Sequence, residues 1–240
     1  MAWALDSVVA ERSTAAADTP LMKRLTVTDL EAIVALQEAV RAGLPLGFIR
    51  SKDASELRAY LDDTLGVAYG IAEEGALLAM ALLRVPHENH PNGSTGVPFP
   101  IVPAADWPLR ACILENSMVV PAARGRGYQR ALLAARRAHA LSVRMKWICA
   151  GVHLQNVVSW ANLLASGMAI VGIRFDRGYP IVGLLGSVDG QALASSARDQ
   201  VAVRMDDPSQ HQAALRDGYI GVRRAAADRV IYQRAAAPCV

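Results

Sequence analysis

The residues best suited to chemistry form a turn rich in arginine and glycine near the middle of the chain. Arg124, Gly125, Arg126 and Gly127 follow an apolar stretch that stops at a proline, and a helical pattern begins directly after them. A helix N-terminus presents unpaired backbone N–H groups and a partial positive charge, and glycines let an anion approach the backbone closely. Arg130 adds further fixed positive charge. The pattern predicts a site for a phosphate or diphosphate group.

This turn does not fit the common nucleotide motifs. The sequence R-G-R-G at 124–127 is neither the G-x-G-x-x-G of dinucleotide-binding folds nor the G-x-x-x-x-G-K-[ST] of P-loops. A surface loop whose glycines cap a helix is one alternative explanation. A binder of nucleic acid or nucleotide phosphates is another, but aromatic residues make up only 5% of the chain and offer little for base stacking.

Glu115 is the second feature that could do chemistry. It is the only carboxylate in the apolar stretch 111–120, where a charge is costly unless water or a partner reaches it. The two-residue period of a strand places Glu115, Ser117 and Val119 on one face. The sequence therefore predicts a cleft at Glu115, an exposed edge of the sheet, or a structural ion pair between Glu115 and an arginine.

The histidines do not indicate a metal site. His87 and His90 have an H-x-x-H spacing in a proline-rich segment, but no helical pattern carries them and no third ligand is evident. With Glu88 and Asn92 they are expected to form a solvated loop that borders the binding site. No bound metal is therefore expected.

Length and composition limit the remaining choices. The 240 residues are 52% hydrophobic, which is enough for a sizeable core, and a net charge of +3 does not by itself indicate nucleic acid. Neither a secretory signal nor a run of about 18 apolar residues is present. We therefore expect a cytoplasmic protein without membrane contact. Its widely spaced cysteines are expected to be free thiols: Cys112, Cys149 and Cys239.

Hydrophobic periodicity and turn residues predict the elements that position these groups. Strands are expected at 22–27, 66–72, 76–85, 111–120, 147–153, 168–175 and 180–185. Helices are expected from 28 to the stop at Gly43, from a cap at Asp53 onward, at 127–141, and from about Asn156 to Gly167. The last part of the chain predicts a strand at 201–205, a helix at 208–216, and strands at 219–224 and 229–234.

In this context the stretch 119–127, V-x-P-x-x-R-G-x-G, resembles the acetyl-CoA signature of the GCN5-related N-acetyltransferases, the GNAT superfamily. The family signature is R/Q-x-x-G-x-G/A, and it lies between the fourth strand and the third helix. Arg124, Gly127 and Gln129 occupy its three positions, although Gln129 departs from the usual glycine or alanine. The predicted order of elements also matches this family, and the resemblance covers roughly residues 22–186.

A second pattern after the fifth predicted strand is similar to the same family. Asn156, Ser159 and Gly167 match its N-x-x-[AS]…G, where the asparagine commonly contacts the pantetheine arm. Leu163 stands where the family often has a tyrosine, and Met168 replaces a phenylalanine. That tyrosine usually reprotonates the CoA thiolate, so the resemblance implies that another group or water does so here. Asn156 could equally be an ordinary helix N-cap.

The resemblance implies an α/β (α+β) fold with a GNAT-like mixed, mostly antiparallel central sheet, helices on both faces, and splayed fourth and fifth strands. Acetyl-pantetheine would insert between those two strands. The expected organisation is a flexible lead at 1–20, an acetyltransferase domain at 21–187 and a small βαββ extension at 188–240. The residues expected to bind acetyl-CoA are Met118, Val119, Val120, Arg124, Gly125, Arg126, Gly127, Tyr128, Gln129, Arg130, Asn156 and Ser159.

The implied activity is an acetyl-CoA-dependent N-acetyltransferase that moves an acetyl group directly to a primary amine of a small molecule or peptide. A general base must remove the ammonium proton. Glu115 is the first candidate because it lies upstream on the fourth strand, and His153 at the end of the fifth strand is the second. Ser117 is expected to bind substrate or order water. A catalytically inactive acyl-CoA-binding module of the same fold is the alternative, and a homodimer is left open.

Overall fold

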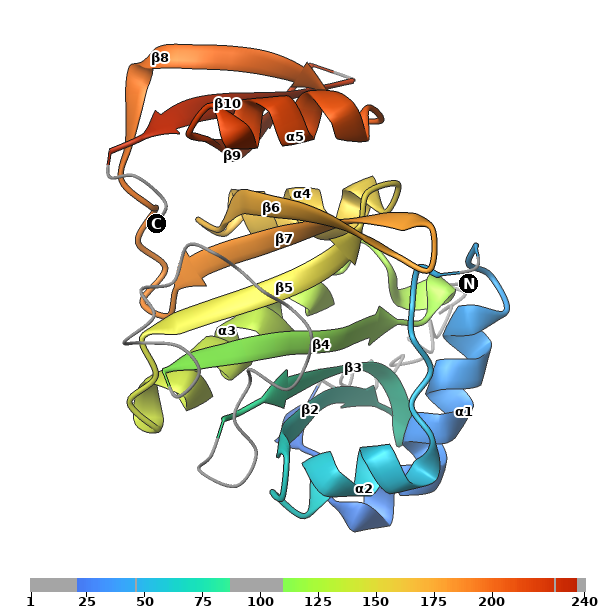
Figure 1. Cartoon of the computed structure of the whole chain (residues 1–240). Coiled ribbons are helices and arrows are strands. Elements are labelled where there is room, and N and C mark those ends of the chain that lie inside the picture. The colour runs from blue at the N-terminus through green and yellow to red at the C-terminus, as the bar shows by residue number, and fades with distance from the viewer. Residues whose placement is uncertain (1–20, 46, 87–109, 227, 237–240) are drawn as a thin grey trace, which may run out of the picture.

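The computed structural model describes residues 21–45, 47–86, 110–226 and 228–236. The predicted lead at 1–20, the segment with His87, Glu88, His90 and Asn92, and Cys239 lie outside the described residues. The described strands form one sheet in the order β1-β2-β3-β4-β5-β7-β6-β9-β10-β8 (Figure 1). β4 and β5 run parallel, and the other described pairs are antiparallel. The predicted mixed, mostly antiparallel sheet is confirmed.

The elements follow the predicted order. They are β1 (Leu21–Arg24), η1 (Val27–Asp29), α1 (Leu30–Arg41), α2 (Ala54–Leu61), β2 (Gly66–Glu73), β3 (Ala76–Arg84), β4 (Ala111–Val119), η3 (Pro121–Ala123), α3 (Tyr128–Ser142), β5 (Trp147–His153), α4 (Val157–Ala165), β6 (Ala169–Asp176), β7 (Tyr179–Ser187), β8 (Ser195–Arg204), α5 (Pro208–Arg216), β9 (Tyr219–Ala225) and β10 (Arg229–Ala235). Most bounds agree closely with the prediction, but the strand predicted at 22–27 ends at Arg24. α1 follows a short 3-10 turn, and β8 begins at Ser195 instead of residue 201.

Helices cover both faces of the sheet, as predicted (Figure 1). α1 and α2 pack on one face through a buried cluster that includes Ile33, Leu57 and Met118. α3 and α4 pack on the other face, where Leu133 and Trp160 belong to the largest buried cluster. Strands β2, β3 and β4 contribute to both clusters because successive side chains point to opposite faces. The two faces therefore have separate cores, with β4 between them.

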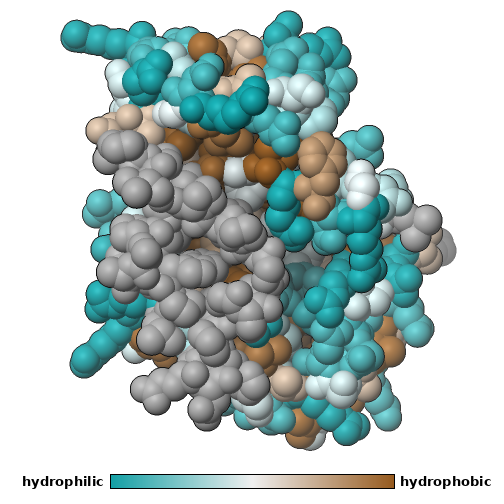
Figure 2. All heavy atoms as spheres, viewed as in Figure 1, coloured by the Kyte–Doolittle hydropathy of each residue, from teal (hydrophilic) through white to brown (hydrophobic). Residues whose placement is uncertain are grey.

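The C-terminal strands continue the same sheet. β9 pairs with β6 at Gly221 and Ile170, and Ile220 packs against Val171 and Leu185. β9, β10, β8 and α5 lie at the top of Figure 1, and Figure 2 shows apolar side chains in the groove between them and the strands below. β7 ends at Ser187, so the predicted boundary at 187–188 falls at the end of a strand. In the described part of the chain, the helices are too short or too polar to cross a membrane.

Candidate active site

The sheet opens between its two central strands. Residues 111–113 of β4 pair in parallel with residues 147–149 of β5. Beyond Ile113 and Cys149, the described pairs of β4 are with β3 alone, and those of β5 are with β7 alone. The backbone edge of β4 that faces the opening is thus left without a strand partner among the described residues. The predicted splay of the fourth and fifth strands is confirmed.

A β-bulge lies in β4 where this opening begins. Glu115 pairs with Leu82 of β3, and Ser117 pairs with Ala81, so Asn116 is an extra residue. Since Leu82 and Ala81 are neighbours in β3, their side chains point to opposite faces, and so do those of Glu115 and Ser117. The prediction that Glu115, Ser117 and Val119 share one face is therefore wrong. The bulge interrupts the two-residue period on which that prediction rested.

Asn116 holds the bulge in an unusual conformation. Its φ is 31°, a region that residues other than glycine seldom adopt. Its side-chain Nδ2 donates a hydrogen bond of 2.9 Å to the Arg50 carbonyl in the connection between α1 and α2. This contact ties the bulge to the segment that borders the opening on the α1–α2 face.

Glu115 lies on the α1–α2 face and forms an ion pair. The Nζ of Lys52 is 2.5 Å from Oε2 of Glu115, and the Lys52 side chain is only 4% exposed. The same ammonium lies 4.0 Å from Glu56 Oε1 and 5.2 Å from the centre of the Tyr60 ring. Glu115 keeps 20% of its side chain exposed, so water still reaches the carboxylate. The predicted ion pair is thus present with a lysine, and the partial exposure agrees with a cleft.

The position of Lys52 is set by a buried clamp. The side-chain amide of Gln37 in α1 donates to the Lys52 carbonyl and accepts from the Lys52 N–H, both at 3.0 Å. Asp53 then caps α2 by accepting from the N–H groups of Ser55 and Glu56, each at 2.9 Å. These contacts fix the chain on both sides of the Lys52 side chain. The sequence prediction identified Asp53 as a cap but missed Lys52 and Gln37.

Tyr60 completes the surroundings of Glu115. Burial raises the pKa of Tyr60 first, and the negative charge of Glu115 raises it further. The buried hydroxyl makes no hydrogen bond of ordinary geometry with a described residue. Tyr60 is therefore a neutral group beside the carboxylate, and it adds no second charge to this side of the opening.

His153 also faces the α1–α2 side, from β5. Ile113 and Cys149 pack together on this face, and the two-residue period carries the same face from Cys149 to His153. The ring lies between those of Phe48 and Tyr179, with centroids 5.0 and 5.3 Å away. It is 4% exposed, and burial lowers its pKa. His153 and Glu115 thus border the opening from its two strands.

The hydrogen bonds of His153 decide which nitrogen carries the proton. Nδ1 accepts from the N–H of Gln155 at 3.2 Å, so in the neutral ring Nε2 bears the hydrogen. Nε2 is buried and has no partner among the described residues. This tautomer donates a hydrogen bond at Nε2 and does not accept a proton there. In this tautomer His153 offers a donor at Nε2, whereas the Glu115 carboxylate offers acceptors.

The arginine- and glycine-rich turn leads from the end of β4 to the start of α3. Gly125 and Gly127 have φ values of 80° and 79°, and a Cβ at either position would meet nothing within 4 Å. Gly127 is the N-cap of α3, so the first N–H groups of the helix open onto this space. Arg124 and Arg130 are exposed. The turn therefore offers backbone donors and positive charge with room for an anion.

Arg126 makes its contacts with two residues of the protein itself. Its guanidinium binds both carboxylate oxygens of Glu73 at 2.7 Å and lies 5.0 Å from the centre of the Tyr128 ring. Arg126 therefore ties the turn to β2. The positive charge left for an anion in this turn comes from Arg124 and Arg130, together with the N-terminus of α3.

The first turn of α3 is linked to α4. Gln129 Oε1 accepts a hydrogen bond of 2.7 Å from Asn162 Nδ2, so the residue that departs from the family pattern bridges the two helices. Asn156 caps α4 by accepting from the Ser159 N–H at 3.3 Å, as the alternative explanation of this residue predicted. Met118 is buried in the cluster beneath α1 and α2, away from α3. Val119, Val120 and the residues from Arg124 to Arg130 follow one another at this end of β4, and Gln129 ties them to α4, the helix of Asn156 and Ser159.

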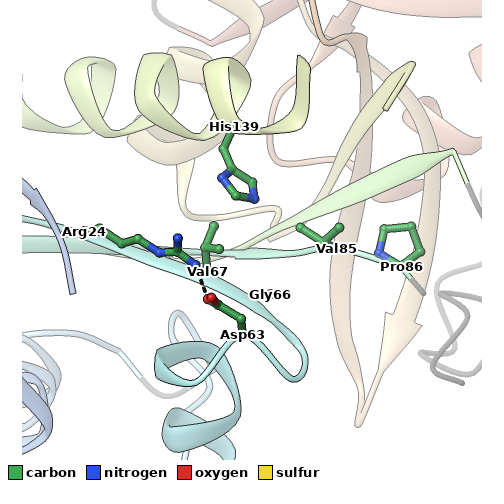
Figure 3. Close-up of a pocket in the computed structure, with 7 residues that line it drawn as sticks. All are labelled: Arg24, Asp63, Gly66, Val67, Val85, Pro86 and His139. Atoms are coloured by element: carbon green, nitrogen blue, oxygen red, sulfur yellow. Dashed lines mark hydrogen bonds and ion pairs between the residues drawn. The ribbon is translucent and has the colours of Figure 1, made fainter. Parts of the chain in front are cut away.

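A separate cavity of about 400 Å³ lies at the other end of α3 (Figure 3). Its lining includes an ion pair between Arg24 and Asp63, together with His139, whose pKa is lowered mainly by burial. His139 is roughly 18 Å from Gly127 along the helix, from the rise of 1.5 Å per residue. This cavity is therefore distinct from the opening between β4 and β5.

The chain is similar to known proteins in structure, although its sequence matches neither a family model nor a curated protein. The ribosomal-protein-S18-alanine N-acetyltransferase from Escherichia coli is similar with a TM-score of 0.54 and 14% identity, over 75% of this chain and 98% of that one. The paiA N-acetyltransferase from Thermoplasma acidophilum, in complex with coenzyme A, has a TM-score of 0.51 and 13% identity, over 69% and 98%.

A third similar structure, yncA from Salmonella typhimurium with its cofactor acetyl-CoA, has a TM-score of 0.51 and 17% identity, over 75% of this chain and 99% of that one. At these identities the likeness shows the fold. The chain has the GNAT fold of acetyl-CoA-dependent acetyltransferases, as its sequence predicted. The matches span nearly the whole of each solved chain and leave part of this chain outside them.

Proposed function

We propose that this protein is an acetyl-CoA-dependent N-acetyltransferase that transfers the acetyl group directly to a primary amine. The observation that best supports this is the bulge at Asn116, which lies where β4 and β5 part. It directs Glu115 toward one face of the opening, while the arginine- and glycine-rich turn begins a helix on the other face. The arrangement separates a base from a phosphate site across one gap in the sheet.

The residues of the turn fit the diphosphate of acetyl-CoA. The open space at Gly125 and Gly127 admits an anion close to the backbone, and the N-terminus of α3 and two exposed arginines favour negative charge. The unpartnered edge of β4 offers backbone groups to the amides of the pantetheine arm, as a missing strand would. Bound there, acetyl-CoA supplies the activated acetyl group.

Glu115 is the general base of the proposed reaction. The amine reaches the opening from the α1–α2 face, and Glu115 removes its ammonium proton through water, since 20% of the carboxylate side chain is exposed. The Lys52 ammonium holds the carboxylate in place through its Oε2 atom. The backbone N–H near Val119 donates to the negative charge that develops on the acetyl oxygen. Two buried free thiols, Cys112 and Cys149, support a reducing compartment such as the cytoplasm.

The test is an acetyl-CoA assay with free-thiol detection across small amines, amino acids and peptides. We expect amine-dependent release of CoA, with the acetylated amine identified by mass spectrometry. Tight binding of CoA without thiol release for any amine would instead indicate an inactive acyl-CoA-binding module. Failure of CoA and acetyl-CoA to bind the folded protein would refute the proposal.

A further inference from the structure

A buried arginine on α3 lies directly beneath the bulge. Arg136 is 1% exposed and donates from Nε to the Leu132 carbonyl at 3.2 Å, from Nη1 to the Leu82 carbonyl at 3.2 Å, and from Nη2 to Ser117 Oγ at 2.9 Å. No carboxylate pairs with it in the part of the chain that the structure describes. A buried cation without a counter-ion is costly in free energy. Burial accordingly lowers the pKa of Arg136.

The contact with Arg136 determines where the Ser117 hydroxyl proton points. A guanidinium carries only donors, so Ser117 Oγ accepts from it and its own hydrogen must be directed elsewhere. The Ser117 side chain makes no other hydrogen bond within the described residues, and Ser117 is partly exposed. The Ser117 hydroxyl is therefore an available donor with the Arg136 guanidinium behind it. It lies on β4 beyond the point where β5 separates from that strand.

The face of the sheet on which Ser117 lies determines which part of a bound CoA its hydroxyl can reach. Ser117 pairs with Ala81, which packs with Tyr128 and Leu132 of α3, so Ser117 lies on the α3 face. A CoA molecule whose diphosphate binds at the N-terminus of α3 enters the opening from that face, with its sulfur leading. The base Glu115 lies on the opposite face. Ser117 is thus on the side from which the leaving group departs.

We propose that Ser117 is a catalytic residue that donates a hydrogen bond to the sulfur of CoA, and that Arg136 is the positioning residue that orients this donor. The inference rests on the proposed N-acetyltransfer. The amine nitrogen forms the new C–N bond, the C–S bond breaks, and its electron pair passes to sulfur. Glu115 takes the ammonium proton before attack, and the second proton, which the nitrogen loses as the amide forms, passes to water. Ser117 and the Arg136 charge stabilise the thiolate on the other face.

The other groups around this position do not replace them. α4, on the far side of the opening, carries no charged residue. Burial raises the pKa of Cys112 on the α3 face to about 12, which keeps that thiol neutral. The remaining charged or titratable groups near the opening lie on the opposite face or where the turn begins α3. Tyr128, the first residue of α3, shares the α3 face with Ser117 but lies roughly 12 Å from Arg136 along the helix, from the rise of 1.5 Å per residue. The others are Glu115, Lys52, Tyr60, Cys149, His153, Arg124, Arg126 and Arg130.

Proton release on CoA binding tests the inference without turnover. Titration calorimetry at pH 7.5 in buffers of different ionisation enthalpy measures the protons released by CoA and by desulfo-CoA, which shares its phosphates but lacks the thiol. A nearby cation lowers a thiol pKa by about 1–3 units from a value near 8.5. We therefore expect on the order of half a proton or more per CoA beyond the value for desulfo-CoA.

Three variants separate this role from a structural one. Arg136→Met should abolish the extra proton release, Arg136→Lys should retain part of it, and Ser117→Ala should reduce it. Ser117→Ala removes one small hydroxyl from a partly exposed site, so it keeps the test available if Arg136→Met does not fold. Arg137→Met is the matched control, because it removes a charge from the next position of α3 and should leave proton release unchanged.

Several outcomes would overturn the inference. Equal proton release by CoA and desulfo-CoA in the wild type would show that the site does not stabilise the thiolate. Unchanged release in folded Arg136→Met and Ser117→Ala proteins would leave Arg136 as a structural support for the Leu82 carbonyl. Both results leave the proposed acetyltransfer intact, whereas an absence of CoA binding would refute the two proposals together.

Discussion

Replacing Glu115 by glutamine tests the proposed base most directly. The change keeps the shape of the side chain and removes its charge and basicity. If Glu115 takes the ammonium proton, turnover should fall by about a hundredfold or more. CoA affinity should stay close to that of the wild type, because the turn at Gly125 and Gly127 lies at the start of α3, on the other face. The rate should also lose its acidic limb as pH is varied.

Glu115→Gln should also lower the free energy of unfolding, and the exposure of the two partners of the ion pair limits the size of this loss. Removing one partner of a fully buried ion pair costs about 3–5 kcal/mol. Lys52 is 4% exposed, but Glu115 is 20% exposed, and Glu56 remains 4.0 Å from the ammonium. We therefore expect Glu115→Gln to reduce the free energy of unfolding by about 1–3 kcal/mol. Adding Lys52→Met should recover much of this loss, because it removes the unpaired charge.

The double variant separates chemistry from stability. Denaturant unfolding should show Glu115→Gln/Lys52→Met to be more stable than Glu115→Gln, while the thiol-release assay shows both to be slow. Glu56→Gln is the matched control, since it removes a carboxylate from the same network at a position outside β4 and should keep near-normal turnover. Near-normal turnover in Glu115→Gln, or full recovery of rate in the double variant, would refute the assignment of Glu115 as the base.

Three further outcomes follow from the structure. Saturating acetyl-CoA should raise the melting temperature through binding to the native state, and an unmoved melting curve would contradict CoA binding. Gly127→Glu should abolish CoA binding in calorimetry, whereas Gly178→Glu, at a similar φ in equally open surroundings, should preserve it. The free energy of unfolding should fall as pH drops from about 7 to 5, because burial lowers the pKa of His211 and the unfolded chain binds the proton more readily. His211→Gln should reduce that dependence in denaturant titrations, and an unchanged slope would show that other groups cause it.

The helices and strands and the arginine- and glycine-rich turn could be predicted because their signals are local. Strand periodicity, the stop at Pro121 and the paired glycines each lie within a few residues of what they determine. The cap at Asp53 was likewise readable, since its partners are two and three residues away. These local signals were enough to predict the fold, which the solved structures share.

The surroundings of Glu115 were not predictable in the same way. The ion pair joins Lys52 to a strand far along the chain, and the clamp from Gln37 depends on how α1 packs. Arg136 lies in the predicted helix at 127–141, but nothing in its neighbours indicated that it would be buried and bond Ser117. Contacts between distant segments are set by packing, and a single sequence carries no local signal for them.

The bulge at Asn116 shows how one extra residue reorganises a site although no pattern in the sequence indicates it. In a regular strand, Glu115 and Ser117 would point to one face, and a base and a donor to the leaving group would compete for the same space. Asn116 separates them, and its side chain bonds the Arg50 carbonyl, so the residue that reverses the faces also anchors the segment that carries Lys52. Glycine would tolerate the positive φ but would lack this hydrogen bond. The choice of asparagine thus couples the geometry of β4 to the placement of the proposed base.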